Sequence, residues 1–184
     1  DYQYVAQTLS DASRAGLTLL QLARHLEQNY DLARGVLNTL VVNTVGANGI
    51  GVEPQPRRLD GSIDTDLAAQ IRKLWENWGE NPEVTRAHDW ESAQRIAART
   101  WFRDGEVFAQ HLDGLVPGLD HGTTVPYSLE LLEPDYIPTD LNSLAPDEIV
   151  QGVRLNAWGA PVEYNVLKYL PGQGGASLLG PGQT

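Results

Sequence analysis

The hydrophobic period of the chain changes once, near Asp104-Gly105, and this change constrains the fold more than any other feature. Before it, apolar residues recur at the spacing of one helix face. After it, apolar and polar residues alternate, as in strands with one buried face. Helices followed by strands predict an α+β fold with antiparallel hairpins, and not the alternating order of a doubly wound parallel sheet.

The helical part has clear start and stop signals. Asp31 and Asp89 are expected N-caps, and Gly105 stands where a helix C-terminal glycine belongs. A loop rich in Gly, Pro and Asn covers residues 47–62, with a short extended piece expected at residues 50–52. The four helices are predicted over residues 17–29, 30–46, 64–82 and 89–105.

The β part is expected to consist of hairpins. The turn sequence NAWGAP joins its last two strands, and a Gly-rich loop over residues 114–124 joins the first two. The strands are predicted over residues 106–112, 127–137, 149–156 and 161–170. We therefore expect a helical part over residues 1–105, an antiparallel β part of the same domain over 106–170, and a Gly-rich tail or linker over 171–184.

The tryptophans divide into two groups. Trp75, Trp78 and Trp101 lie on the apolar faces of predicted helices, so we expect them in the core. Trp158 falls in the turn of the last hairpin, where it either folds back onto its own hairpin or stays exposed as a contact surface. Trp158 is therefore the candidate subunit-contact residue.

One cluster of side chains resembles a metal site: His111, Asp113, Asp120 and His121. Its spacing matches no ligand motif, so structural or solvated roles are favoured. The carboxylate pairs Asp104/Glu106, Glu130/Glu133/Asp135 and Asp147/Glu148 are expected by chance in a chain with 24 acidic residues. The segment GANGIG follows a helix and not a strand, so it lacks the context of a dinucleotide loop. No catalytic residue, cofactor or metal is expected.

Composition excludes several other classes of protein. The chain has no cysteine, and therefore no disulfide and no thiolate metal site. Residues 104–184 carry eleven acidic residues against two basic ones, Arg154 and Lys168, which disfavours a surface that grips nucleic acid. No apolar run is long enough to span a membrane. A chain that begins DYQYVAQ, without methionine, is expected to be a fragment of a longer protein.

The order of segments resembles the lambda-like family of tailed-bacteriophage portal proteins. The similarity runs from about residue 17 to 170 and rests on order and spacing more than on any one motif. The segments that carry it are VVNTVGANGI, a Trp-containing helix, RDGEVF, LELLEPDYI and IVQGVRLNAWGAPVEYNV.

The resemblance implies a structural subunit of a portal ring and not an enzyme. Such rings, usually dodecamers of the full-length protein, sit at one capsid vertex as the head-tail connector and pass double-stranded DNA during packaging and ejection. Implied partners are other copies of the chain, the terminase, and capsid, head-completion and tail proteins, but no membrane. The implied location is the virion, after assembly in the host bacterial cytoplasm, and this chain would form the wing-like part.

Two other functions remain as alternatives. A metal-dependent hydrolase would use His111, Asp113, Asp120 and His121. A peptide-binding module would use a free edge of the β part. The acidic second half fits the portal reading if its negative surface keeps a moving polyanion from adhering.

Overall fold

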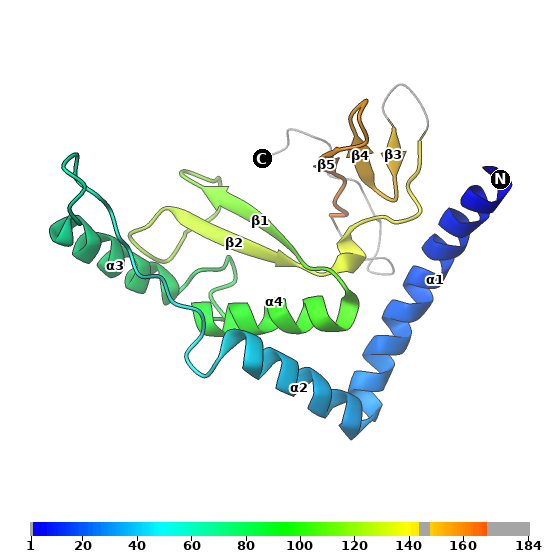
Figure 1. Ribbon diagram of the computed structural model, residues 1–184, viewed down its shortest axis with the longest axis horizontal. Helices are drawn as coiled ribbons and strands as arrows, with labels where there is room; N and C mark the ends of the chain where they lie inside the picture. The colour runs from blue at the N-terminus through cyan, green and yellow to red at the C-terminus, as the bar shows by residue number, and fades with distance from the viewer. Residues whose placement is uncertain (1, 144–147, 169–184) are drawn as a thin grey trace. The chain divides into compact units, whose positions relative to one another are not determined.

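The computed structural model describes residues 2–143 and 148–168 and confirms the α+β fold (Figure 1). In this described part, four helices come first and small antiparallel sheets of two and three strands follow. The chain forms two compact units. One is Tyr30–Leu132, and the other combines the described parts of Asp1–Asn29 and Glu133–Thr184. The tail predicted over 171–184 lies outside the described residues.

Three helices belong to the unit Tyr30–Leu132, and side-chain caps begin two of them. The side chain of Asp64 accepts a hydrogen bond from the Leu67 N–H, and Asp89 does the same for the Ser92 N–H. The N-cap predicted at Asp31 is wrong, because Tyr30 takes that position with an extended backbone. The helices are α2 (Asp31–Val45), α3 (Thr65–Gly79) and α4 (Trp90–Asp104).

The core between helices of this unit lies where α2 runs alongside α4 (Figure 1). Val41 and Val45 of α2 are buried against Ala98 of α4, and Phe102 packs against them. The prediction that Trp101 is a core residue is wrong, because 54% of it is exposed. The face of α4 that meets α2 carries Ala98 and Phe102, and the neighbouring Trp101 only stacks on Phe102.

The loop before α3 forms no strand at residues 50–52. A buried side chain of α4 binds this backbone instead. The Gln94 amide accepts from the Ile50 N–H at 2.7 Å and donates to the Ile50 carbonyl at 3.1 Å. One amide side chain thus satisfies both backbone groups, as a neighbouring strand would.

The first sheet consists of β1 (Phe108–Asp113) and β2 (Tyr127–Leu132), paired antiparallel from Phe108↔Leu132 to Asp113↔Tyr127. On the other side of β2, the Leu129 N–H donates to the Pro82 carbonyl and the Val84 N–H donates to the Leu129 carbonyl. The strand predicted to reach residue 137 ends at Leu132. The 3-10 helix η1 (Pro134–Tyr136) follows, because Pro134 has no N–H to continue a ladder.

The other unit begins with α1 (Tyr2–Asn29), which is longer than the predicted helix over 17–29. The Arg24 guanidinium of α1 pairs with the Asp135 carboxylate of η1. The second sheet has the order β3-β4-β5. Its strands are β3 (Ile149–Val150), β4 (Val153–Leu155) and β5 (Pro161–Tyr164).

The predicted strand over 149–156 is therefore two strands joined by a tight turn. Gln151 and Gly152 both have positive φ, 51° and 79°, as the central residues of a type I′ turn require. A Cβ on Gly152 would lie 2.9 Å from the Pro138 carbonyl oxygen. The hairpin predicted around NAWGAP is confirmed as β4–β5.

Among the helices described, not one combines the length and apolar character that crossing a bilayer requires.

Candidate interaction surfaces

Four aromatic rings gather where α3, α4 and β2 meet in the unit Tyr30–Leu132. Trp75 and Trp78 share one face of α3, and Trp90 is the first residue of α4. The ring centroids lie 5.0 Å apart for Trp75–Trp78 and for Trp78–Trp90, and 5.8 Å apart for Trp78–Tyr127. Aromatic pairs at these distances add about 0.5–1.5 kcal/mol each beyond their buried area. The cluster therefore fixes α3 against the start of α4 and of β2.

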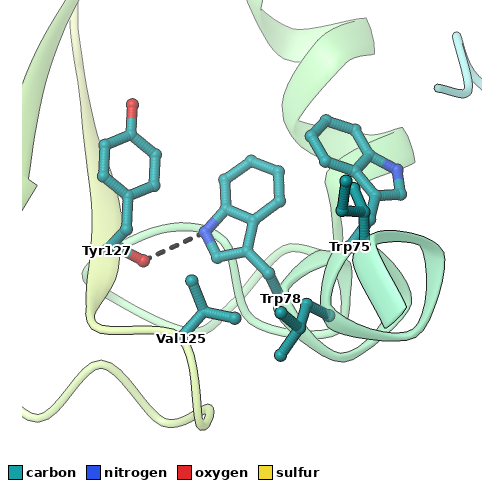
Figure 2. A pocket seen from close by; sticks show the side chains of 6 residues that line it. Trp75, Trp78, Val125 and Tyr127 are labelled. Atoms are coloured by element: carbon teal, nitrogen blue, oxygen red, sulfur yellow. Dashed lines mark hydrogen bonds between the residues drawn. The ribbon is translucent and has the colours of Figure 1, made fainter. Parts of the chain in front are cut away.

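Trp78 is the buried member of this cluster, with 5% of its surface exposed. Its indole Nε1–H donates to the Tyr127 carbonyl at 3.0 Å, the bond drawn in Figure 2. Burial of an indole without such a partner would cost free energy. The core position predicted for Trp78 is confirmed, whereas Trp75 is only half-buried.

A shallow apolar groove lies beside these rings (Figure 2). Its volume is about 230 Å³. Leu74 in its wall is 51% exposed, so the groove opens to solvent. An exposed apolar concavity of this kind is typical of a contact site for another apolar side chain. The groove is lined by Ile71, Leu74, Trp75, Trp78, Val125 and Tyr127.

Tyr127 brings the only ionisable group into the groove lining. Burial, and then the negative charge of Asp113, raise the pKa of its hydroxyl above the ordinary value. That hydroxyl is hydrogen-bonded to the His111 ring. Since the phenol stays neutral at pH 7, the groove lining is uncharged and suits an apolar ligand.

A second exposed apolar feature is Trp158, in the turn between β4 and β5. Its side chain is 94% exposed, so it does not fold back onto its own hairpin. The Asn156 side chain accepts hydrogen bonds from the Trp158 and Ala160 N–H groups at 2.9 and 3.0 Å. The turn therefore presents the indole to solvent on an ordered backbone. The role of Trp158 in subunit contact remains a prediction.

The metal-like cluster does not assemble into a ligand set. His121 is bound by the Ser128 hydroxyl at 2.7 Å and by the Gly114 carbonyl at 2.8 Å, one at each ring nitrogen. Both contacts hold the Gly-rich loop to the ends of β1 and β2. Both ring nitrogens of His121 are thus engaged in structural hydrogen bonds.

The other members of the cluster also serve the loop. Asp120 accepts a hydrogen bond from the Gly122 N–H and pairs with Arg86 at 2.7 Å, and these contacts lower the pKa of its carboxyl. His111 is engaged with Tyr127, and Asp113 ends β1. Within residues 2–143 and 148–168, no three His, Asp or Glu side chains are grouped as a metal ion requires. The hydrolase alternative therefore has no site in the described structure.

Three of the carboxylates named in pairs from the sequence, those of Asp104, Glu133 and Asp135, are paired with arginines. The Asp104 side chain is paired with Arg103 at 2.6 Å. Asp135 and Glu133 both face Arg24, Glu133 at 3.9 Å. Asp147 lies outside the described residues. These contacts link helix ends and η1, and they do not converge on one cleft.

Glu83 was not singled out by any sequence pattern, and it is buried in the loop before α4. Burial by itself would raise the pKa of its carboxyl. Hydrogen bonds from the Thr85 hydroxyl and from the Thr85, Ala87 and His88 N–H groups outweigh burial and leave the pKa lowered. The signal that could have pointed to it is a lone acid between Pro82 and Val84, in a stretch that continues the sheet.

The peptide-binding alternative needs a free strand edge. β2 is bonded on both sides, by β1 and by residues 82–84. In the described part of the chain, β1 has β2 as its single ladder partner. The apolar groove lies on α3 and beside the start of β2, and not along that edge.

Comparison with known proteins places nearly all of the described chain in one sequence family. A family model described as phage portal protein, lambda family, matches residues 5–182. No curated protein matches the chain. The family match includes the helical segments, both sheets and the loops between them, so it covers both compact units.

Proposed function

The chain belongs to the lambda family of phage portal proteins, and from this premise we propose that it forms the wing part of a ring subunit through which double-stranded DNA is packaged and ejected. The family is structural rather than catalytic, and its members act as oligomers that contact the capsid and the terminase. The observation that carries the proposal is the match over residues 5–182, nearly the whole chain.

The two exposed apolar features support a role in assembly. A subunit of a ring must bury apolar surface against its neighbours, and interfaces are enriched in aromatic residues. Trp158 is presented on an ordered turn, and the α3 groove is open and uncharged. We propose Trp158 as a subunit contact. Head-completion proteins and the terminase are proposed partners of the assembled ring.

The charge distribution supports passage of DNA. Residues 104–184 carry nine more negative than positive charges. Binding to a duplex grows with each cation that meets a phosphate, so an acidic surface keeps DNA from adhering. A ring that conducts DNA needs this property. A map of the assembled ring with this segment far from the channel would remove the argument.

The direct test is the mass and shape of the intact protein by light scattering and electron microscopy. We expect closed rings, with no DNA sequence preference and no turnover. An intact protein that stays monomeric at all concentrations would contradict the proposal.

The contribution of Trp158 is tested in the same assay. Trp158→Ser removes an indole that is 94% exposed, so the circular dichroism spectrum of the isolated chain should not change. Rings should dissociate at a protein concentration about tenfold higher than wild type, as for loss of an interface aromatic. Leu115→Ser, at another almost fully exposed residue, is the matched control. Unchanged rings in Trp158→Ser would exclude the contact.

A further inference from the structure

The segment GANGIG, which lacks the context of a dinucleotide loop, contains the single Asn-Gly pair of the chain, Asn48-Gly49. After an asparagine, the next backbone nitrogen can attack the carbon of the side-chain amide, and glycine hinders this approach least because it has no Cβ. Asparagine is accordingly among the thermolabile residues of proteins. The pair is therefore a candidate site of spontaneous chemical modification, whatever the chain assembles into.

The reacting groups of this pair are open to solvent and unrestrained. The loop after α2, cyan in Figure 1, runs past the first turns of α4, and Asn48 lies exposed in a bend of this loop. Within residues 2–143 and 148–168, no hydrogen bond holds the Asn48 side chain or the Gly49 N–H. The amide carbon and the nitrogen that attacks it are thus both available.

The other asparagines lack this combination. Asn81 precedes Pro82, which has no N–H to lose in the reaction. Each of the remaining asparagines has a hydrogen-bonded side-chain amide and is followed by a residue with a side chain. They are Asn29, Asn38, Asn43, Asn77, Asn142, Asn156 and Asn165.

The fold requires glycine after Asn48. Gly49 has a φ of 71°, in the region that favours glycine. A Cβ there would lie 3.1 Å from Cγ of Glu91 and 3.3 Å from Nε2 of Gln94. Another residue at position 49 would therefore be both strained and crowded against α4. The close approach of the loop to α4 thus demands the very residue that makes Asn48 reactive.

We propose that Asn48 deamidates spontaneously in the folded protein, with water as the co-reactant. The Gly49 nitrogen bonds to the side-chain amide carbon of Asn48, the bond from that carbon to Nδ2 breaks, and ammonia leaves with the Gly49 amide proton. A cyclic imide remains. Water then opens the imide at either of its carbonyl carbons, which yields aspartate or isoaspartate at this position.

Both products disturb the contact between the loop and α4. Each adds a negative charge close to Glu91. Isoaspartate also adds a methylene group to the main chain between two anchors. One anchor is the Ala47 carbonyl, bound by the Arg95 guanidinium, and the other is the Ile50 backbone, bound by the Gln94 amide. A longer main chain between these fixed points should release the Gln94 bonds.

Peptide mapping by mass spectrometry tests the proposal on the intact protein, kept folded at mildly alkaline pH and sampled over time. We expect the peptide that contains Asn48 to gain the mass difference between OH and NH₂, with fragment ions that assign the change to this residue. The product should separate into two chromatographic species of equal mass, the aspartate and isoaspartate forms. Asn48→Gln, whose longer side chain must close a larger ring, should keep its mass. The peptides that contain the hydrogen-bonded Asn142 and Asn156 are internal controls.

Two outcomes would overturn the proposal. The first is an unchanged Asn48 in the folded protein beside its conversion in urea, because the fold would then keep the two reacting groups apart. The second is conversion of Asn142 or Asn156 as fast as that of Asn48, because exposure and unrestrained groups would then not select the site.

Hydrogen exchange measures the effect on the loop. The Ile50 N–H donates to the Gln94 amide at 2.7 Å, and it should exchange faster in protein aged until Asn48 is converted than in Asn48→Gln aged in the same way. Asn48→Asp carries the new charge on an ordinary main chain, so it should exchange more slowly than the isoaspartate form. Equal exchange in aged wild type and aged Asn48→Gln would contradict the release of the loop.

Discussion

Glu83 illustrates how a single buried carboxylate orders the loop that leads into α4. Its oxygens accept from the Thr85 N–H at 2.9 Å and the Ala87 N–H at 2.7 Å, besides the Thr85 hydroxyl. These donors converge on one buried carboxylate, which holds the turn of the loop in place. The free energy of this loop therefore depends on the ionised form of one side chain.

Replacement of this carboxylate should destabilise the protein. Glu83→Gln keeps the size but turns an NH₂ group toward donors, so we expect a loss of about 1–3 kcal/mol in the free energy of unfolding near neutral pH. Urea unfolding measures it. Glu80→Gln, at a neighbouring exposed acid, is the control and should change little. Equal stabilities of the two variants would contradict the role of Glu83.

The lowered pKa of Glu83 predicts in which direction the free energy of unfolding changes as the pH falls. The folded-state pKa of Glu83 is lowered, so its contribution is fully present above the ordinary glutamate pKa. It is lost as the pH falls through the ordinary value and then through the lowered one. Wild type should therefore lose more stability than Glu83→Gln between about pH 6 and about pH 3. Parallel pH profiles for the two proteins would exclude this contribution.

At the scale of elements, two glycines with positive φ hold different local structures. Gly105 ends α4 at φ 90°, and a Cβ there would meet nothing within 4 Å. Gly152 makes the β3–β4 turn, and a Cβ there would be 2.9 Å from the Pro138 carbonyl oxygen. The first position needs glycine for its backbone conformation alone, and the second also for lack of space.

The two glycines should therefore differ on substitution. Gly105→Ala is expected to cost about 1–2 kcal/mol, the strain of a left-handed alanine. Gly152→Ala should cost about 1–3 kcal/mol more, because the new methyl group also overlaps Pro138. Thermal unfolding followed by circular dichroism measures both.

The matched control for both variants is Gly35→Ala. Gly35 lies within α2, with an ordinary φ and open space around it, so alanine should stabilise the protein by about 0.5–1 kcal/mol. If Gly152→Ala destabilises the protein no more than Gly105→Ala does, the β3–β4 turn must shift away from Pro138.

At the scale of the whole molecule, the boundaries of the two compact units do not coincide with the change from helices to strands at residue 105. The unit Tyr30–Leu132 is continuous along the chain and contains three helices and the first sheet. The other unit joins α1 to the segment after Leu132, partly through Arg24 and Asp135. Each unit mixes helix with strand. The boundary predicted at residue 105 remains a proposal.

Expression of separate fragments tests whether the chain folds as the units divided after Leu132 or as parts divided at residue 105. Residues 30–132 expressed alone should fold cooperatively, because they contain the helix core, the tryptophan cluster and β2. Residues 1–105 alone lack Tyr127 and β2 and should lose the native tryptophan fluorescence and unfold without a sharp transition. Cooperative unfolding of 1–105, with none for 30–132, would favour the boundary at residue 105.

The sequence by itself determined the order and type of the elements. The periodicity predicts all four helices and the β1–β2 and β4–β5 hairpins but not the β3–β4 turn, and Asp89 and Gly105 mark the ends of α4 correctly. These features depend on interactions between residues that are only a few positions apart, so the sequence pattern is enough to predict them. The same order of segments was enough to identify the family.

The tertiary structure alone decided which apolar side chains are buried and which stay exposed. α2 buries Val41 and Val45 but leaves Val36 exposed, and α4 turns Phe102 rather than Trp101 toward them. An apolar stripe is wider than the contact that one neighbouring helix makes, so its period cannot say which part is covered. The buried Glu83 and the α3 groove depend likewise on contacts between segments far apart in the chain.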